Sequence, residues 1–477
     1  MKKKNIMIIT VDQMCWRALQ VNGNQFSKTP NINKIAENGV NFSKCYTACP
    51  LCCPSRASYW TSRYPHETGA MTNLVKTQHV PLDMATMGDT FRQNGYDTIH
   101  FGNCHDSDGL RGFEDHPTPN EDAIVFPEEY DNFNFTLDTY RDEITTKRVV
   151  DYFENYSGDK PFLLATELVN PHNICGWVRG HMGKHKDLPL PCGFELPPLP
   201  ENFDFSDIEN RPIAVQYICC DLNLQAWASE WEDETFRHYL AAYYYYMNLV
   251  DKQIGRIMDA LEKSGEKDNT LIVFYSDHGD SMSARRRVTK AVDFYEEVTR
   301  VPLMFSGNSV ANKTTNDMLT TTLDIFPTLC SYAGVEIPDG VQGIDLSNAI
   351  IGEEIKTERE YVVSQWHSMF RYIISQGRML CTEDFKYTYY IEDHCEELFD
   401  LKNDPYEKIN VAKKDEYKDD LEKMRKYFSE YLEKTKDPFM SMKPEAEKRW
   451  RSHKIGYTEH RGDSVICEEN RKKGKIL

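Results

Sequence analysis

Three short apolar runs limit the fold of this chain more than any other feature of its sequence. They span 5–11, 162–169 and 270–275 and are too short for typical helices. Continuous apolar runs of this length are typical of strands buried on both faces, as in parallel sheets. Segments with helical periodicity, such as 139–155 and 236–264, lie between them. The alternation predicts an α/β fold with a doubly wound, mainly parallel central sheet flanked by helices.

The character of the chain changes after about residue 354. Short strands are predicted at 361–363, 370–375, 378–382 and 386–391, followed by an amphipathic helix at 417–433. We therefore expect a large α/β domain over 1–355 and a smaller C-terminal α+β domain, built on an antiparallel sheet, over 356–477. The charged tail from Lys443 is interpreted as a solvated or oligomer-binding arm, which leaves a homo-oligomer open.

An irregular insertion is predicted at 173–230, where repeated prolines exclude long helices. A long insertion after a strand end often serves as a substrate lid or a specificity loop. An irregular surface excursion explains the same pattern equally well.

The formal net charge of -19 excludes some classes of partner. Phosphate backbones would be repelled, so nucleic acid is not expected as a partner. A small anionic substrate would need a local positive site; the arginines at 285–287 are interpreted as a solvated loop or as a guide for such a substrate. No apolar stretch approaches the roughly 20 residues of a membrane span, so no membrane partner is expected.

The 14 cysteines bear on the cellular compartment. They include adjacent pairs that do not suit a secreted disulfide framework. The apolar run after the basic N-terminus is too short for a signal peptide. We expect a reduced, cytoplasmic protein.

Polar side chains follow two of the predicted strands. Asp12 and Gln13 end the first run, and Asp277 and His278 end the third. Because the carboxyl ends of parallel strands meet at one edge of a sheet, these residues are placed to converge on one cation. Oxygen ligands of this kind suit hard cations. Taken singly, each aspartate is more readily explained as a helix cap.

The segment from Cys49 to Arg63 crowds three cysteines, two prolines and two arginines together. Its useful spacing is Cys52-x-Pro54-x-Arg56. A buried thiol explains Cys52 alone, and a zinc knuckle would add Cys49 and Cys53. No second ligand pair with the usual zinc spacing occurs nearby.

Together with Thr61-x-Arg63-Tyr64-Pro65, this segment resembles the signature of the formylglycine-dependent sulfatases of the alkaline phosphatase superfamily. Further blocks resemble that family in its order and cover about 5–412. They are 95–98 with 102–105, 170–172, 276–279, Lys290 with 294–302, 324–328 and 399–405.

The resemblance implies that Cys52 is oxidised to formylglycine by a formylglycine-generating or sulfatase-maturating enzyme and then hydrated. One hydroxyl of the resulting diol attacks sulfur, and collapse of the hemiacetal expels sulfate. The implied ligands of one divalent metal, Ca²⁺ ahead of Mg²⁺ or Mn²⁺, are Asp12, Gln13, Cys52, Asp277 and His278.

The same resemblance implies roles for further side chains. Arg56 would orient the diol, His105 would remove its proton and His172 would protonate the leaving oxygen. Lys290 would hold sulfate oxygens as a point charge. Taken singly, each histidine is more readily a hydrogen-bonded structural residue. The residues assigned to substrate binding are Asn103, Lys290, Trp366 and His367.

Two positions depart from the family pattern. Gln13 stands where many sulfatases have a second aspartate, and Asn103 stands where a lysine is usual. The Asp-Gln and Asp-His combination also resembles the phosphonate monoester hydrolase branch of the superfamily. The sequence thus predicts a sulfuric ester hydrolase acting on a small anionic sulfate ester, of a sugar, aryl alcohol, steroid or choline. The alternatives are a phosphonate monoester or phosphodiester hydrolase with the same nucleophile, and a catalytically silent metal-binding homologue.

Overall fold

A computed structural model describes residues 3–75, 78–117, 136–180, 195–204, 208–216, 223–290, 293–355, 359–367, 376–391 and 394–441. Within these residues the main body is an eight-stranded sheet with the order β4-β3-β5-β1-β6-β7-β2-β8. Its strands are β1 (Asn5–Val11), β2 (Gly39–Tyr46), β3 (Asp97–Gly102), β4 (Glu114–Pro117), β5 (Phe162–Leu168), β6 (Thr270–Ser276), β7 (Arg300–Ser306) and β8 (Thr314–Thr321).

The sheet is mainly parallel, as the buried apolar runs predict. β7 runs antiparallel to both of its neighbours, β6 and β2. The other five pairs are parallel. The three apolar runs form the adjacent central strands β5, β1 and β6, where both faces are covered.

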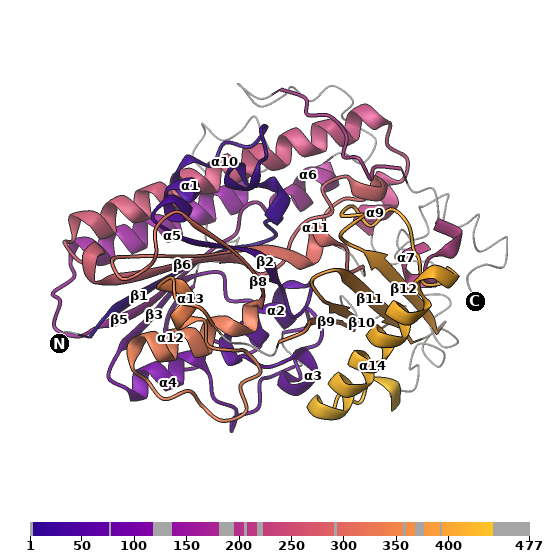
Figure 1. Cartoon of the computed structure of the whole chain (residues 1–477). Helices are drawn as coiled ribbons and strands as arrows, with labels where there is room; N and C mark the ends of the chain where they lie inside the picture. The colour runs from indigo at the N-terminus through magenta and orange to yellow at the C-terminus, as the bar shows by residue number, and fades with distance from the viewer. Residues whose placement is uncertain are drawn as a thin grey trace.

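Helices cover both faces of this sheet (Figure 1). Met7, Ile9 and Val11 of β1 pack under α1 (Pro30–Glu37), α5 (Thr136–Glu154) and α10 (Asp233–Lys263). Ile6 and Ile8 face the opposite side, with α2 (Cys52–Thr61), α4 (Met87–Gln93) and α12 (Ile325–Ala333). Successive side chains of this strand therefore point alternately into two separate hydrophobic cores. Shorter α-helices among the described residues of this body are α3 (Pro65–Thr68), α6 (Ile174–Gly180), α7 (Ile213–Gln216), α9 (Asn223–Ala228), α11 (Glu296–Thr299) and α13 (Ser347–Ile350).

A second, antiparallel sheet follows, with the order β12-β11-β10-β9. Its elements are β9 (Val362–Trp366), β10 (Gly377–Cys381), β11 (Phe385–Tyr390), β12 (Cys395–Asp400) and α14 (Lys418–Thr435). One face packs on α14 through Leu380 and Phe428. The other packs against Leu51 and Phe294 of the larger body. The predicted fold class is confirmed, whereas the boundary at 355 stays a prediction.

The element boundaries differ from the prediction in explicable ways. β4 and β8 were not expected because they are polar strands on the sheet edges, β4 mostly exposed and β8 mostly half-buried. α4 begins at Met87, because the Thr86 side chain caps it by accepting from the Asp89 N–H. The strand predicted at 370–375 and the tail from 443 lie outside the described residues. In 173–230, the described segments contain only short helices, and the lid stays a prediction.

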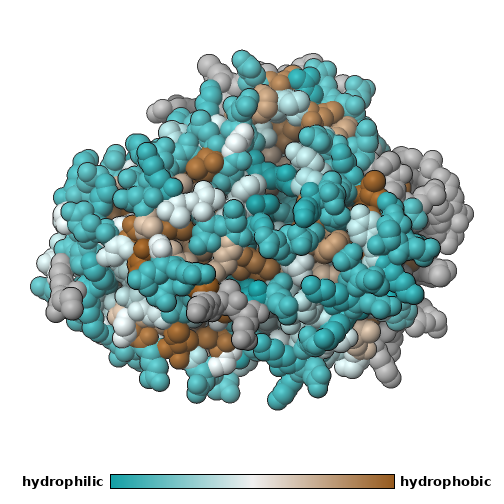
Figure 2. All heavy atoms as spheres, viewed as in Figure 1, coloured by the Kyte–Doolittle hydropathy of each residue, from teal (hydrophilic) through white to brown (hydrophobic). Residues whose placement is uncertain are grey.

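The surface seen in Figure 2 is mostly hydrophilic, with small separate hydrophobic areas. Exposed large hydrophobic side chains among the described residues are scattered, such as Leu82 and Met440. No helix in the described part of the chain is long and apolar enough to span a bilayer.

Candidate active site

The parallel pairing of β1 and β6 brings two polar strand ends together. Val11 lies opposite Ser276, so Asp12 and Asp277 leave the sheet side by side. The Gln13 N–H donates to Asp277 Oδ1 at 3.0 Å, which ties the two loops together. His278 follows and is fully buried. The convergence predicted from the two strand ends is therefore present.

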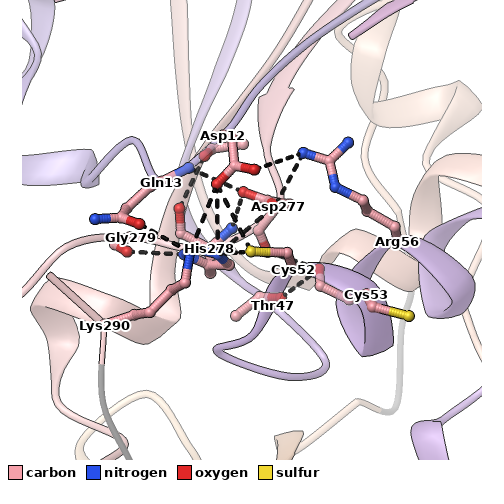
Figure 3. Close-up of polar contacts among 12 residues, drawn as sticks. Asp12, Gln13, Thr47, Cys52, Cys53, Arg56, Asp277, His278, Gly279 and Lys290 are labelled. Carbon is pink, nitrogen blue, oxygen red and sulfur yellow. Dashed lines mark hydrogen bonds and ion pairs between the residues drawn. The ribbon is translucent and has the colours of Figure 1, made fainter. Parts of the chain in front are cut away.

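Helix α2 places Cys52 next to Asp12, Asp277 and His278 (Figure 3). Cys52 is the first residue of the helix, and its Sγ lies 3.2 Å from His278 Nε2 and 3.9 Å from Asp12 Oδ1. Ser55 anchors the helix, because its hydroxyl donates to the backbone carbonyl of Asp277 at 2.6 Å. All ten residues of α2 are buried.

Arg56 lies one helical turn after Cys52 and is fully buried. Its Nη2 is 3.1 Å from carboxylate oxygens of both Asp12 and Asp277. Its Nη1 donates to Glu167 Oε1 on β5 at 2.7 Å. One guanidinium thus fixes three carboxylates from three strands, which is the forked geometry for which arginine is suited.

The neighbouring cysteines do not share this site. Cys53 points away in Figure 3, with its Sγ 3.0 Å from the Ser107 hydroxyl. Burial raises the pKa of the Cys53 thiol to about 12. Cys49 packs in a hydrophobic cluster with Leu51 and Trp366. Among the described residues, the only cysteine in the group with Asp12, Asp277 and His278 is Cys52, so the zinc-knuckle alternative is wrong.

The residues at this point fit a divalent cation. Candidate ligand atoms of Asp12, Cys52, Asp277 and His278 all lie within 4.8 Å of one another. His278 Nε2 is 3.7 Å from both Asp12 Oδ1 and Asp277 Oδ2. Asp277 Oδ2 is buried and accepts no hydrogen bond within the described structure, although Arg56 lies near it. A buried carboxylate oxygen with no hydrogen bond is open to a metal ion in addition to the Arg56 charge.

Gln13 is held in an unusual backbone conformation, with φ of 71°. The Tyr243 hydroxyl from α10 donates to its carbonyl at 2.6 Å. Its side-chain Nε2 donates to Asp280 at 2.8 Å, which leaves Oε1 to accept from Lys290 Nζ at 2.9 Å. A residue in the left-handed region persists only where its surroundings hold it, as they do here.

Lys290 and His172 influence the pKa values of the groups in this cluster. Burial lowers the pKa of Lys290, but the neighbouring Cys52 and Asp12 outweigh burial and raise it, so the ammonium stays charged. Burial and the Lys290 charge lower the pKa of His172 to about 3. Burial also raises the pKa of Asp12, but His172 and Lys290 outweigh it and hold that pKa well below its usual value.

The other predicted site residues lie at different distances from this centre. His105 is partly buried after β3, and burial and Arg56 lower its pKa. Asn103 stands at the end of β3, where its N–H donates to the Glu167 carbonyl at 3.2 Å. Trp366 is buried in the same hydrophobic cluster as Leu51, and His367 follows it at the end of β9. Their substrate contacts stay predictions.

Sequence reasoning missed Glu167 and Asp280, which orient Arg56 and Gln13. A charged residue inside the otherwise apolar run 162–169 was a usable signal for Glu167. The solvated-loop interpretation of 285–287 is wrong for two of its arginines. Arg285 and Arg287 are buried in ion pairs with Glu297 and Asp293.

Comparison with known proteins agrees with this geometry. The model of the sulfatase family matches residues 4–335, and that of the N-sulphoglucosamine sulphohydrolase C-terminal region matches 290–434. A Δ4,5-hexuronate-2-O-sulfatase of Bacteroides thetaiotaomicron is 38% identical over 466 residues, 97% of this chain and 95% of that protein. The solved structure of a 2-O GAG sulfatase superposes with a TM-score of 0.88 at 38% identity, covering 93% of this chain and 94% of the other.

A phosphonate monoester hydrolase of Agrobacterium radiobacter shares the fold, with a TM-score of 0.75 at 20% identity over 91% of this chain and 96% of the other. The fold, the cluster at its strand ends and the family matches thus define the class of this protein as a hydrolase. The chain belongs to the sulfatase family and is a sulfuric ester hydrolase.

Proposed function

We propose that the protein hydrolyses a sulfate monoester with formylglycine formed from Cys52. The observation that carries this proposal is the position of Cys52. It lies at the first turn of a buried helix, with its Sγ facing Asp12 and His278 and with Arg56 one turn behind. A hydrated aldehyde at this position supplies a nucleophilic hydroxyl, and a divalent metal, with Ca²⁺ favoured, would lower the pKa of that hydroxyl.

The metal would be held by Asp12, Gln13, Asp277 and His278, together with the modified residue at 52. Arg56 would keep both aspartates oriented and balance their charge. Lys290, charged and adjacent to Gln13, would bind sulfate oxygens. The first turn of α2 adds the partial positive charge of a helix N-terminus.

Two histidines are assigned to proton transfer. His105 would remove a proton from the hydroxyl left on residue 52, a role that suits the lowered pKa of its imidazole. His172 would protonate the leaving oxygen. Its low pKa reflects burial beside Lys290, and the negative charge of a bound sulfate opposes that effect.

The substrate we propose is a 2-O-sulfated, unsaturated hexuronate, the compound class in the name of the relative that is 38% identical over nearly the whole chain. Such a sugar carries a carboxylate besides its sulfate. Arg179 on α6 is exposed, and after burial, Lys290 and His278 it makes the smallest contribution to the lowered pKa of His172, so a further positive charge lies toward this end of the site.

The test is sulfate release by protein co-expressed with a sulfatase-maturating enzyme. We expect turnover of the 2-O-sulfated hexuronate, loss of at least about a thousandfold in Cys52→Ala, and much smaller loss in the matched variant Cys53→Ala. The tryptic peptide 45–56 of active protein should carry one aldehyde in place of one thiol.

Equal losses in the two variants would contradict the choice of nucleophile. A phenyl phosphonate monoester serves as the competing substrate. Faster cleavage of that compound than of any sulfate ester would favour the phosphonate hydrolase alternative, and an unmodified, inactive protein would favour the silent homologue.

A further inference from the structure

A second group of metal-ligating side chains lies outside the catalytic cluster. His100 is on β3, Cys104 follows the end of that strand, and Asp115 is on β4. β3 and β4 pair in parallel with His100 directly opposite Asp115. The His100 side chain is fully buried, whereas Cys104 and Asp115 are exposed. Three different ligand types therefore meet at the surface edge of the central sheet.

The separations of the ligand atoms lie on both sides of those around a tetrahedral cation, and the shortest is a hydrogen bond between His100 and Asp115. His100 Nδ1 is 2.7 Å from Asp115 Oδ1, and Cys104 Sγ is 3.2 Å from Asp115 Oδ2 and 3.9 Å from His100 Nδ1. Bonds of about 2.0–2.3 Å to a tetrahedral Zn²⁺ place such atoms roughly 3.3–3.6 Å apart. Small rotations of the exposed Cys104 and Asp115 side chains are sufficient to reach those values.

The other ring nitrogen of His100 is also arranged as in a metal site. His100 Nε2 lies 3.1 Å from Glu167 Oε2, and Glu167 is itself held by Arg56 at 2.7 Å and Tyr59 at 2.5 Å. A histidine that binds metal usually donates its other N–H to a carboxylate, which fixes the tautomer. With Nε2–H donated to Glu167, the lone pair of Nδ1 faces Cys104 and Asp115.

We propose that His100, Cys104 and Asp115 form a binding site for a zinc-class divalent cation, distinct from the catalytic metal site. Thiolate, imidazole and carboxylate together favour Zn²⁺ over Ca²⁺. The exposed side of the cluster leaves the fourth position to water. Binding releases the thiol proton of Cys104 and any proton on His100 Nδ1 to solvent. Because Glu167 contacts both His100 and Arg56, this site is joined to the catalytic cluster through a single buried carboxylate.

The test is a Co²⁺ titration of the full chain carrying Cys52→Ser, with saturating Ca²⁺ and a non-thiol reductant. The substitution removes the sulfur of the catalytic cluster, and Ca²⁺ occupies its oxygen ligands. We expect one equivalent of Co²⁺ to give a thiolate-to-cobalt charge-transfer band. Adding Cys104→Ser should abolish the band, and adding Asp115→Asn should weaken Co²⁺ binding at least about tenfold while keeping the band.

The matched control is Cys395→Ser, because Cys395 is a partly exposed cysteine on β12, in the other sheet. It should leave both the band and the affinity unchanged, and Zn²⁺ should displace Co²⁺ at one equivalent. A band that survives Cys104→Ser, or that Cys395→Ser removes equally, would overturn the proposal. Circular dichroism checks that each variant is folded, and the exposed Asp115 provides a second route if Cys104→Ser is not.

Discussion

Glu167 accepts hydrogen bonds from four side chains on three elements of the structure. The donors are Thr10 on β1, Arg56 and Tyr59 on α2, and His100 on β3. Burial raises the pKa of Glu167, but the Arg56 guanidinium outweighs it, so that the pKa is lowered and the carboxylate stays charged. Glu167 is therefore a counter-ion that holds Arg56 against Asp12 and Asp277.

We expect Glu167→Gln to destabilise the fold and to lower kcat. Removing one partner of a buried ion pair leaves the other uncompensated and typically costs about 3–5 kcal/mol. Urea denaturation measures the stability, and sulfate release at saturating substrate measures kcat. Glu154→Gln at the exposed end of α5 is the control, for which a change within about 0.5 kcal/mol is expected. Unchanged stability and kcat in Glu167→Gln would show that Arg56 does not depend on this carboxylate.

The turn after β3 is the element that connects the predicted base His105 to the sheet. Asp106 is 7% exposed, and its Oδ2 accepts from the Leu110 N–H at 2.7 Å. Burial and the Glu167 charge raise the pKa of the Asp106 carboxyl to about 6. Between the ordinary value of 3.8 and about 6, the folded state binds more protons than the unfolded state. Stability therefore falls as pH rises through this window.

We expect Asp106→Asn to remove this pH dependence, because the amide oxygen still accepts from Leu110 and carries no charge. The variant should match the wild type near pH 4 and exceed its stability by up to about 3 kcal/mol at pH 7. Chemical denaturation across this pH range is the measurement. Asp108→Asn, exposed on the same turn, should leave the pH profile unchanged. A difference that shrinks as pH rises would contradict the assignment.

Helix α2 forms although the intrinsic helix propensity of its residues is low. It contains Pro54 and four hydroxyl-bearing side chains over ten fully buried residues, and its apolar residues define no clear stripe. The helix is stable because its polar groups are paired with the sheet, through Ser55 to Asp277 and through Arg56 to Glu167. Its position, and hence that of Cys52, is set by these buried contacts.

At the scale of the whole molecule, the two sheets are joined by a buried ion cluster. Lys386 on β11 lies 2.8 Å from Glu296 Oε1 on α11 and 2.7 Å from Glu407 Oε1, and its Nζ also donates to the Phe294 carbonyl at 3.0 Å. These contacts hold the segment that follows Lys290 against the small sheet. The smaller sheet thus contacts Phe294 and Glu296 of the larger body, which follow the predicted sulfate ligand Lys290 in the sequence.

We expect Lys386→Met to destabilise the protein by about 3–5 kcal/mol, because Glu296 and Glu407 would remain buried without their shared cation. It should also raise KM for the sulfate ester, because Phe294 and Glu296, which follow Lys290 in the sequence, lose their contacts with Lys386. Denaturation and steady-state kinetics are the two measurements. The control is Lys408→Met, a half-exposed lysine close to Glu407 in the chain. Full stability together with unchanged KM would mean that the two sheets are coupled by their apolar contacts alone.

The fold class followed from the sequence because its signals are local. Buried parallel strands produce continuous apolar runs, and the polar residues Asp12 and Asp277 come directly after two of them. The order of the sequence blocks likewise indicated the family. Predictions failed where the local pattern was weak, at the polar edge strands β4 and β8 and at the buried Arg285 and Arg287.

The sequence by itself therefore determined the strand ends, the cysteine signature and the candidate ligands. The tertiary structure showed that Cys52, the cysteine indicated by the signature, faces Asp12 and His278, and it alone decided that Glu167 and Asp280 hold Arg56 and Gln13. The physical reason is that these pairings join residues between 40 and 267 positions apart. Such contacts depend on sheet register and burial, which leave no periodic trace along the chain.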